Sequence, residues 1–419
     1  MTAQALNGAA SVIDGDPEGW IAEFAQLLAL DTSFPPGDGY GPFADALEPL
    51  FAPLGFEFER VTVPERLCSP PRGPAGRPRI NLIGRHRSGK PVCSLYFHTD
   101  VVPPGDGWSG NPFQLRQIGE KLVARGTSDM KGTIIATLMA LRAMAAANLP
   151  LVLDPHLLFC TDEEGGLYPG VRYLAEQELI EGHVLCFNGG AAPRIWAGCF
   201  GSLDLEIAVT GRAGHSGDSL SAINAVEAAM PIIEALLALK SHVEARTSVL
   251  PPPPHFEGRP LNARLSITAI HGGAKGSALP GLCTILVNRR FMPEENYETV
   301  LAELEDTVRG AAARSPALSV ETGLAGLLMP VSNPDGSAYW PRWKAALSYG
   351  FGYVPSDFGR WGSSSSSDMG FVQAAGIQEI LLGGLSRPGN NGHGADEFTT
   401  ISDIRALARA ILFYLSGQY

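Results

Sequence analysis

Residues 92–100 read Val92-Cys93-Ser94-Leu95-Tyr96-Phe97-His98-Thr99-Asp100, an apolar run that ends in a histidine and an aspartate two positions apart. The run predicts a strand, and on a strand residues i and i+2 point to the same side. Asp100 is therefore placed to accept a hydrogen bond from the far ring nitrogen of His98, which leaves the near nitrogen for a cation. Taken alone, the pair also fits an ordinary hydrogen-bonded loop at a strand end.

Three further polar clusters occur where predicted strands end or helices begin: residues 125–132, 162–164 and 390–397. Asp129 lies at the turn into an apolar helix expected over residues 134–147, and His393 precedes the last helix. Glu163 and Glu164 follow a buried strand directly and project in different directions, so one can bind a metal while the other reaches its water. Burying several acids together is costly unless a cation neutralises them. A solvated acidic loop is the alternative, but the carboxyl end of a sheet is where α/β sites lie.

Five segments in order carry a resemblance over nearly the whole chain: His-x-Asp-Val-Val-Pro, Gly-x-x-Asp-Met-Lys-Gly, Glu-Glu, Gly-x-x-Gly-His-Ser and a late His before Asp-Glu. Together they resemble the aminoacylase, carboxypeptidase G and succinyl-diaminopimelate desuccinylase family of metallohydrolases. The resemblance implies one or two divalent metal ions per subunit, zinc or manganese, with His98 on one ion, Glu164 and His393 on the other, and Asp129 as the bridge. It also implies that Glu163 is the general base and that Asp100 orients His98.

Asn188 departs from the family pattern, which places an Asp or Glu as the remaining ligand after the strand over residues 184–187. A neutral amide brings no charge to offset dehydration of the ion, so it is a poor ligand for zinc or manganese. We expect a weakened position beside His98 and Asp129 and one tightly held metal. The alternative is that Asn188 still coordinates through its carbonyl oxygen and two ions bind.

Strand and helix patterns alternate along most of the chain, which predicts an α/β protein with a mainly parallel sheet flanked by helices. Near residue 203 apolar and acidic residues begin to alternate, as in a half-exposed strand. A β-α-β-β-α-β order follows, which suits a ferredoxin-like domain. We expect a discontinuous metal-binding catalytic domain like that of zinc peptidases, residues 1–200 and 326–419, with an inserted lid or dimerisation domain, residues 201–325.

Residues of the inserted domain and of a later serine loop are expected to meet the substrate. The resemblance implies that His215 reaches across a homodimer to stabilise the oxyanion, whereas alone it reads as a histidine at a helix start. The resemblance also implies that Arg289 or Arg290 binds a substrate carboxylate, for which a bidentate guanidinium is suited, and a surface pair is the alternative. Asn288 stands where the family has an acid. A serine loop resembles the family's substrate loop, with a serine-capped helix start as the alternative; its candidate residues are Ser364, Ser365 and Ser366.

These parts imply hydrolysis of a C–N bond in a small carboxylate-bearing substrate by metal-activated water. Glu163 would take the proton and return it to the departing nitrogen. Nothing requires an amide carbon, and the chain looks most like the branch with 5-nitroanthranilate aminohydrolase, which implies aryl-amine hydrolysis and aromatic degradation. The alternatives are an N-acyl amino acid deacylase or an aminopeptidase- or carboxypeptidase-like amidohydrolase, and, in another class, a catalytically silent small-molecule binder.

The composition argues against some classes of binding partner. The 419 residues carry a net charge of −12 at pH 7, which argues against nucleic acid or anionic membrane as a partner. Six scattered cysteines without a C-x-x-C pair indicate reduced core residues. Residues 1–17 lack the layout of a signal peptide and no apolar run approaches the ~20 residues that span a bilayer, so we expect a cytoplasmic protein.

Overall fold

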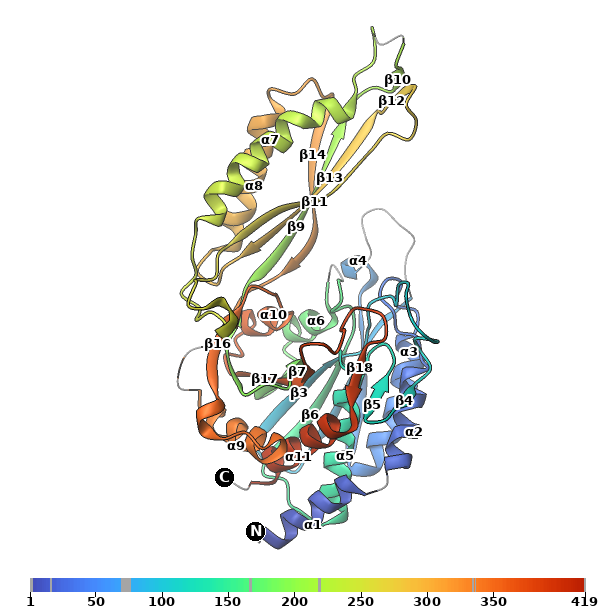
Figure 1. Ribbon diagram of the computed structural model, residues 1–419, viewed down its shortest axis with the longest axis vertical. Helices are drawn as coiled ribbons and strands as arrows, with labels where there is room; N and C mark the ends of the chain where they lie inside the picture. The colour runs from blue at the N-terminus through green and yellow to red at the C-terminus, as the bar shows by residue number, and fades with distance from the viewer. Residues whose placement is uncertain are drawn as a thin grey trace. The chain divides into compact units, whose positions relative to one another are not determined.

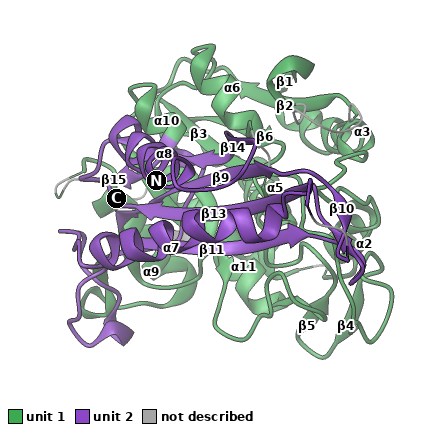
Figure 2. Ribbon diagram, turned by 90° about the horizontal axis from the view of Figure 1, so that it is seen from above, with its two compact units in different colours: residues 1–196, 333–360, 371–419 green, residues 197–332, 361–370 purple. Residues whose placement is uncertain are grey.

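The computed structural model describes residues 3–15, 17–68, 77–165, 168–217, 220–333, 335 and 337–417 (Figure 1). The chain divides into two compact units (Figure 2). Unit 1 comprises Met1–Trp196, Asn333–Arg360 and Phe371–Tyr419, and unit 2 comprises Ala197–Ser332 and Trp361–Gly370. The short segment that carries the serine loop thus groups with unit 2.

A six-stranded mixed sheet forms the centre of unit 1, in the order β1-β2-β6-β3-β7-β17. Four neighbouring strands, β6, β3, β7 and β17, run parallel, and β1 and β2 are antiparallel at one edge. The predicted α/β class with a mainly parallel sheet is confirmed. The strands are β1 (Phe56–Val63), β2 (Arg79–His86), β3 (Val92–His98), β6 (Asp154–Cys160), β7 (His183–Gly190) and β17 (Ile380–Ser386).

A row of aromatic rings crosses this sheet just before the strand ends. Phe97, Phe159 and Phe187 lie on the adjacent strands β3, β6 and β7, with ring centroids 5.2 and 5.3 Å apart. Phe51 extends the row at one end and Trp343 at the other, at 5.7 and 6.3 Å. Such buried ring contacts add about 0.5–1.5 kcal/mol per pair beyond the area that they bury. The row therefore holds the carboxyl ends of three strands in register.

Helices pack on this sheet and on one another. Helix α5 is buried almost all round and begins at Lys131, three residues earlier than expected. It contacts α1, α2 and α11, and α11 also packs on α9. Thr400 caps α11 by accepting a hydrogen bond from the Asp403 main-chain nitrogen at 3.1 Å. The helices of unit 1 are α1 (Ala3–Asp14), α2 (Pro17–Leu28), α3 (Tyr40–Phe51), α4 (Glu65–Cys68), α5 (Lys131–Ala146), α6 (Gly170–Glu176), α9 (Trp340–Phe351) and α11 (Ile401–Ser416), and α10 (Met369–Ala374) crosses the unit boundary.

Unit 2 has the expected ferredoxin-like topology. Its antiparallel sheet has the order β11-β13-β9-β14, and the helices α7 and α8 pack on each other. Strict alternation of buried and half-exposed residues along β13 gives the sheet one buried face. Its elements are β9 (Gly201–Thr210), α7 (Ala225–Glu244), β11 (Arg264–Gly272), β13 (Leu282–Phe291), α8 (Tyr297–Ala312) and β14 (Ser319–Leu328).

Short strands complete the fold. They form three small ladders, β10-β12, β15-β8-β16 and β18-β5-β4. The six cysteines, all in described segments, form no disulfide. Over the described part of the chain, no helix combines the length and apolarity needed to cross a membrane. The short strands are β4 (Arg116–Ile118), β5 (Lys121–Val123), β8 (Arg194–Cys199), β10 (Gly214–His215), β12 (Ala278–Leu279), β15 (Val331–Ser332), β16 (Gly359–Ser363) and β18 (Phe398–Thr400).

Candidate metal centre

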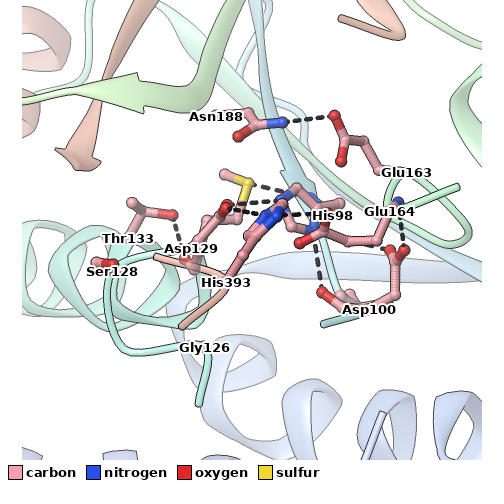
Figure 3. Close-up of polar contacts among 12 residues, drawn as sticks. His98, Asp100, Gly126, Ser128, Asp129, Thr133, Glu163, Glu164, Asn188 and His393 are labelled. Atoms are coloured by element: carbon pink, nitrogen blue, oxygen red, sulfur yellow. Dashed lines mark hydrogen bonds and ion pairs between the residues drawn. The ribbon is translucent and has the colours of Figure 1, made fainter. Parts of the chain in front are cut away.

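The carboxyl ends of the parallel strands bring the sequence-predicted residues of unit 1 together (Figure 3). His98 is the last residue of β3, Glu163 and Glu164 follow β6, and Asn188 lies near the end of β7. Because these three strands are neighbours in the sheet, their ends meet at one edge. Asp129, just before α5, completes the group from a loop.

Asp129 lies between two histidines. Its Oδ1 is 3.1 Å from His98 Nε2, and its Oδ2 is 3.1 Å from His393 Nε2. The same His393 nitrogen is 3.2 Å from Glu164 Oε2. Ligand atoms of His98, Asp129 and Glu164 all lie within 4.8 Å of one another. Each oxygen of Asp129 thus faces a different histidine, as a bridging carboxylate would.

The electrostatics of the group indicate surplus negative charge. Burial would lower the pKa of His98, but its hydrogen bond to Asp129 and the nearby carboxylates outweigh burial and raise the pKa well above its usual range. Hydrogen bonds to Asp129 and Glu164 raise the pKa of His393 to about 10. Burial would raise the pKa of Asp129, but its bonds to both histidines hold it well below its usual range. A divalent cation would satisfy the same carboxylates in place of these protons.

The donor set fits such an ion. Two imidazole nitrogens with aspartate and glutamate oxygens are the mixture that zinc and similar divalent metals accept. Asn188 adds no carboxylate to this set. Its Nδ2 donates a hydrogen bond of 2.7 Å to Glu163 Oε1, so the amide is directed at the neighbouring glutamate (Figure 3). Glu163 and Glu164 diverge as expected, one toward Asn188 and the other toward His393.

Asp100 orients His98 differently from the expectation. The main-chain carbonyl of Asp100 lies 3.0 Å from His98 Nδ1, whereas the nearest carboxylate oxygen is 3.8 Å away. The reason is that β3 ends at His98, so the side chains no longer follow the strand alternation on which the prediction relied. The other carboxylate oxygen accepts a hydrogen bond of 2.8 Å from the main-chain nitrogen of Glu164. Asp100 therefore joins the β3 and β6 ends, and its backbone fixes the His98 ring.

Two residues near the centre were given no role in the sequence analysis. Glu397 is fully buried and accepts hydrogen bonds from the loop that carries Asp129, and the Arg125 guanidinium pairs with it at 2.6 Å. Both belong to the clusters at residues 125–132 and 390–397, so an acid and a base adjacent to the ligand motifs were the available signal. Their pairing across 272 positions is visible only in the fold.

The remaining candidates lie in unit 2. Arg290 is half-buried, and its guanidinium donates to Ser366 Oγ at 2.7 Å and to Asn288 Oδ1 at 3.2 Å. Ser365 shares a hydrogen bond of 2.7 Å with Ser363, and Ser364 is half-buried beside it. The structure thus brings together Arg290 and the serine loop, two features that the sequence only suggested separately.

Arg289 and His215 have different surroundings. Arg289 is fully buried and forms an ion pair with Glu295 at 2.5 Å. Because successive residues of β13 point to opposite faces of the sheet, only one of the two arginines can leave the interior, and it is Arg290. Of the two candidate arginines, Arg290 is therefore the more accessible one. His215 is exposed on β10, where its Nδ1 accepts a hydrogen bond of 3.1 Å from the Gly217 nitrogen.

Comparisons with known proteins identify the family and the fold. Residues 94–416 match the family model of peptidase family M20/M25/M40. A succinyl-diaminopimelate desuccinylase of Acidiphilium cryptum is 30% identical over 339 residues, which cover 78% of this chain and 83% of that protein. The fold is similar to the di-peptidase Dug1p from Saccharomyces cerevisiae, with a TM-score of 0.80, 16% identity and 100% coverage of both chains. It is also similar to the M20 family metallo-carboxypeptidase Sso-CP2 from Sulfolobus solfataricus, with a TM-score of 0.76, 18% identity and coverage of 95% and 98%.

Proposed function

The chain belongs to peptidase family M20/M25/M40 and is a metallohydrolase of C–N bonds, and on that premise we propose that it cleaves an amide bond in a small carboxylate-bearing substrate. An N-acyl amino acid or a dipeptide fits this description. The observation that carries the proposal is the placement of Asp129 between His98 and His393, with Glu164 beside it. The relatives act on acyl and peptide bonds, which favours this alternative over aryl-amine hydrolysis. Nothing in the comparisons supports the aromatic reading or manganese in particular.

We propose that Asp129, Glu164 and His393 hold one divalent ion tightly and that His98 with Asp129 offers a weaker second position. The engagement of the Asn188 amide with Glu163 supports this asymmetry, because the second position then lacks a charged ligand of its own. When bound, such an ion lowers the pKa of water toward ~7 and polarises a carbonyl oxygen.

Glu163 is our candidate for the general base. The Asn188 amide holds one oxygen of its carboxylate at 2.7 Å, which restricts the rotation of the side chain. A carboxylate held in this way takes a proton from the attacking water and returns it to the leaving nitrogen. Replacing the Glu163 carboxylate would leave the proposed metal ligands in place. The role of Glu163 can therefore be tested separately from that of Glu164.

In unit 2 we propose that Arg290 binds the substrate carboxylate. Its guanidinium donates to two neutral oxygens, on Ser366 and Asn288. These contacts do not neutralise the positive charge, which can therefore attract a carboxylate of the substrate. Asn288 in turn donates to Asp204 Oδ1 at 2.7 Å, which fixes the amide so that its oxygen faces Arg290. His215 as an oxyanion donor and unit 2 as the dimerisation surface of a homodimer remain proposals inherited from the family resemblance.

The experiment that tests the function is a substrate panel with zinc- or manganese-loaded protein. It contains N-acyl and N-succinyl amino acids, dipeptides and nitro-substituted 2-aminobenzoates, and it follows amine and ammonia release. We expect amine release from the acyl or peptide substrates. Ammonia release from the aminobenzoates alone would overturn the amide proposal in favour of aryl-amine hydrolysis. No product from any substrate of the panel would favour a binding protein.

A further inference from the structure

A buried ion pair lies behind the candidate metal centre. Arg125 and Glu397 are 1% and 0% exposed, and Arg125 Nη1 is 2.6 Å from Glu397 Oε2. Removing two charges from water is expensive, and the cost is offset only when the pair is well placed and its remaining polar atoms are hydrogen-bonded. The partners of Glu397 therefore indicate what the pair does.

Glu397 gathers the loop that carries Asp129. Its Oε2 accepts a hydrogen bond of 2.9 Å from the Gly126 nitrogen. Its Oε1 accepts bonds from the Ser128 nitrogen at 2.8 Å, the Ser128 hydroxyl at 3.1 Å and the Asp129 nitrogen at 3.1 Å. One carboxylate thus fixes the main chain from Gly126 to Asp129. Gly126 takes a φ of +84°, and a Cβ there would lie 2.9 Å from Val101 Cγ1, so the loop has this shape only with glycine.

Arg125 extends the connection to the loop that carries His393. Its Nη2 donates a hydrogen bond of 3.1 Å to the carbonyl oxygen of Gly394, the residue after His393. The Trp108 ring covers the guanidinium, with its centroid 5.2 Å away. The Ala124 nitrogen also donates to the Glu397 carbonyl at 3.1 Å. The two loops that supply Asp129 and His393 are therefore joined through one charge pair.

We propose that Glu397 and Arg125 are positioning residues that set Asp129 and His393 in the geometry of the metal centre before an ion binds. The proposal rests on the proposed function, because it assumes that these two side chains are ligands. Its physical basis is that hydrogen bonds hold the main chain of both loops in place, so less conformational entropy is lost when the ligands become ordered around an ion.

The test is Glu397→Gln, with Asp154→Asn as the matched control. Glutamine keeps the shape but replaces one acceptor oxygen with an NH₂ group that opposes the loop nitrogens, and it leaves Arg125 without a counter-charge. Asp154 is also a buried carboxylate that accepts loop hydrogen bonds, from Ser88 N at 2.8 Å and Lys90 N at 3.0 Å. It opens β6, at the opposite end of the strand from Glu163 and Glu164. The control therefore reproduces the loss of a buried carboxylate away from the centre.

Two readouts follow, neither of which needs turnover. In metal-free protein, we expect amide hydrogen exchange at Gly126, Ser128 and Asp129 to accelerate in Glu397→Gln and to stay at the wild-type rate in Asp154→Asn. In titrations with Zn²⁺ or Mn²⁺ against a competing chelator, we expect the dissociation constant to rise about 10- to 100-fold in Glu397→Gln, the range seen when partners of metal ligands are removed. Asp154→Asn should leave it at the wild-type value.

Unchanged metal affinity in a folded Glu397→Gln, or an equal loss of affinity in both variants, would overturn the proposal. Should Glu397→Gln fail to fold, Arg125→Lys gives the same test, because lysine keeps the charge but cannot reach Glu397 and Gly394 together. A wild-type protein that binds neither ion would overturn the proposed function instead, and the exchange pattern would still decide whether Glu397 holds the loop.

Discussion

At the scale of single residues, the two neighbouring glutamates of the candidate centre, Glu163 and Glu164, make different contacts. Glu164 faces His393 at 3.2 Å, whereas Glu163 accepts the Asn188 amide at 2.7 Å. The difference arises because consecutive residues after a strand project in different directions. Under the proposed function, this divergence lets Glu164 bind the ion while Glu163 acts as the base.

Replacing Glu163 with Gln should separate binding from chemistry. We expect metal content to remain at the wild-type level, because the Asp129, Glu164 and His393 side chains are untouched. Turnover of the best amide substrate should fall about 10²- to 10⁴-fold, the usual contribution of a general base. Metal analysis and steady-state kinetics on the same preparation check this, and wild-type turnover in the variant would exclude Glu163 as the base.

Replacing Asn188 with Asp should raise the number of metal ions bound. A carboxylate supplies the charge that the amide lacks, so the position near His98 and Asp129 gains a ligand. Elemental analysis after dialysis against Zn²⁺ measures the stoichiometry. Asn188→Ser is the matched control, since it removes the amide without adding charge, and we expect it to leave the stoichiometry unchanged. An Asp variant with the wild-type stoichiometry would show that Asn188 does not limit the second site.

At the scale of elements, aromatic packing supports the strand ends in addition to the hydrogen bonds of their polar residues. Phe97, Phe159 and Phe187 each lie on a strand that carries site residues at or just beyond its end, and their rings stack across β3, β6 and β7. The same sheet is tied to the last helix, because His183 Nε2 of β7 lies 2.6 Å from the Tyr414 hydroxyl of α11. Both features predict changes in stability.

Phe97→Ala should lower the free energy of unfolding by about 3–5 kcal/mol, because it leaves a cavity under the centre of the aromatic row. Urea denaturation followed by fluorescence or circular dichroism measures the change. Ile118→Ala is the control: its side chain is 58% exposed, so we expect a change within about 0.5 kcal/mol. Equal effects of the two substitutions would mean that the row adds nothing to the stability of the sheet.

His183 should make the protein less stable in mild acid. Burial, aided by the Arg342 charge, lowers the pKa of His183 to about 4, below the ~6.5 of an exposed histidine. Between these values the unfolded chain binds the proton more tightly. The free energy of unfolding therefore falls as the pH drops from ~6.5 to ~4, by up to about 3 kcal/mol from this residue.

The check is the difference in stability between pH 7 and pH 5, measured by urea unfolding. His183→Gln cannot titrate, so its stability should fall less over this interval than that of the wild type. Identical pH dependence in the two proteins would show that His183 does not contribute.

At the scale of the whole molecule, the metal centre and the candidate substrate residues belong to different units. His98, Asp129, Glu164 and His393 all lie in unit 1, whereas Arg290 lies in unit 2. An ion that binds the folded centre and not the unfolded chain stabilises the protein by mass action. The ligands come from residues 98 to 393, so the ion would join segments across most of the chain.

Removing the metal should therefore lower the melting temperature. At a free ion concentration 100 times the dissociation constant, binding contributes about 2.7 kcal/mol, which EDTA would remove. Thermal unfolding with and without Zn²⁺ measures the shift, and His393→Ala should respond less to added Zn²⁺. A melting temperature that ignores the ion over a wide concentration range would contradict a structural contribution of the centre.

The sequence by itself determined the fold class and the candidates for the centre. Apolar runs that end in His98 or in Glu163 and Glu164 predict buried parallel strands and their polar ends, because the pattern of apolar and polar residues within one segment indicates whether that segment is buried. The β-α-β-β-α-β order of unit 2 was predicted in the same way, from the alternation of apolar and polar residues and from the lengths of the segments. These features depend on neighbours in the chain, which a sequence displays directly.

Only the tertiary structure decided how distant residues meet. In the folded chain the Asn188 amide contacts Glu163, and the main chain of Asp100, not its carboxylate, contacts His98. Arg289 is buried, whereas Arg290 is accessible. Arg125 pairs with Glu397. Each outcome depends on where a strand ends, or on a contact between residues far apart in the chain. Such contacts arise from packing, in which the position of one side chain is fixed by several others at once, and no local pattern records them.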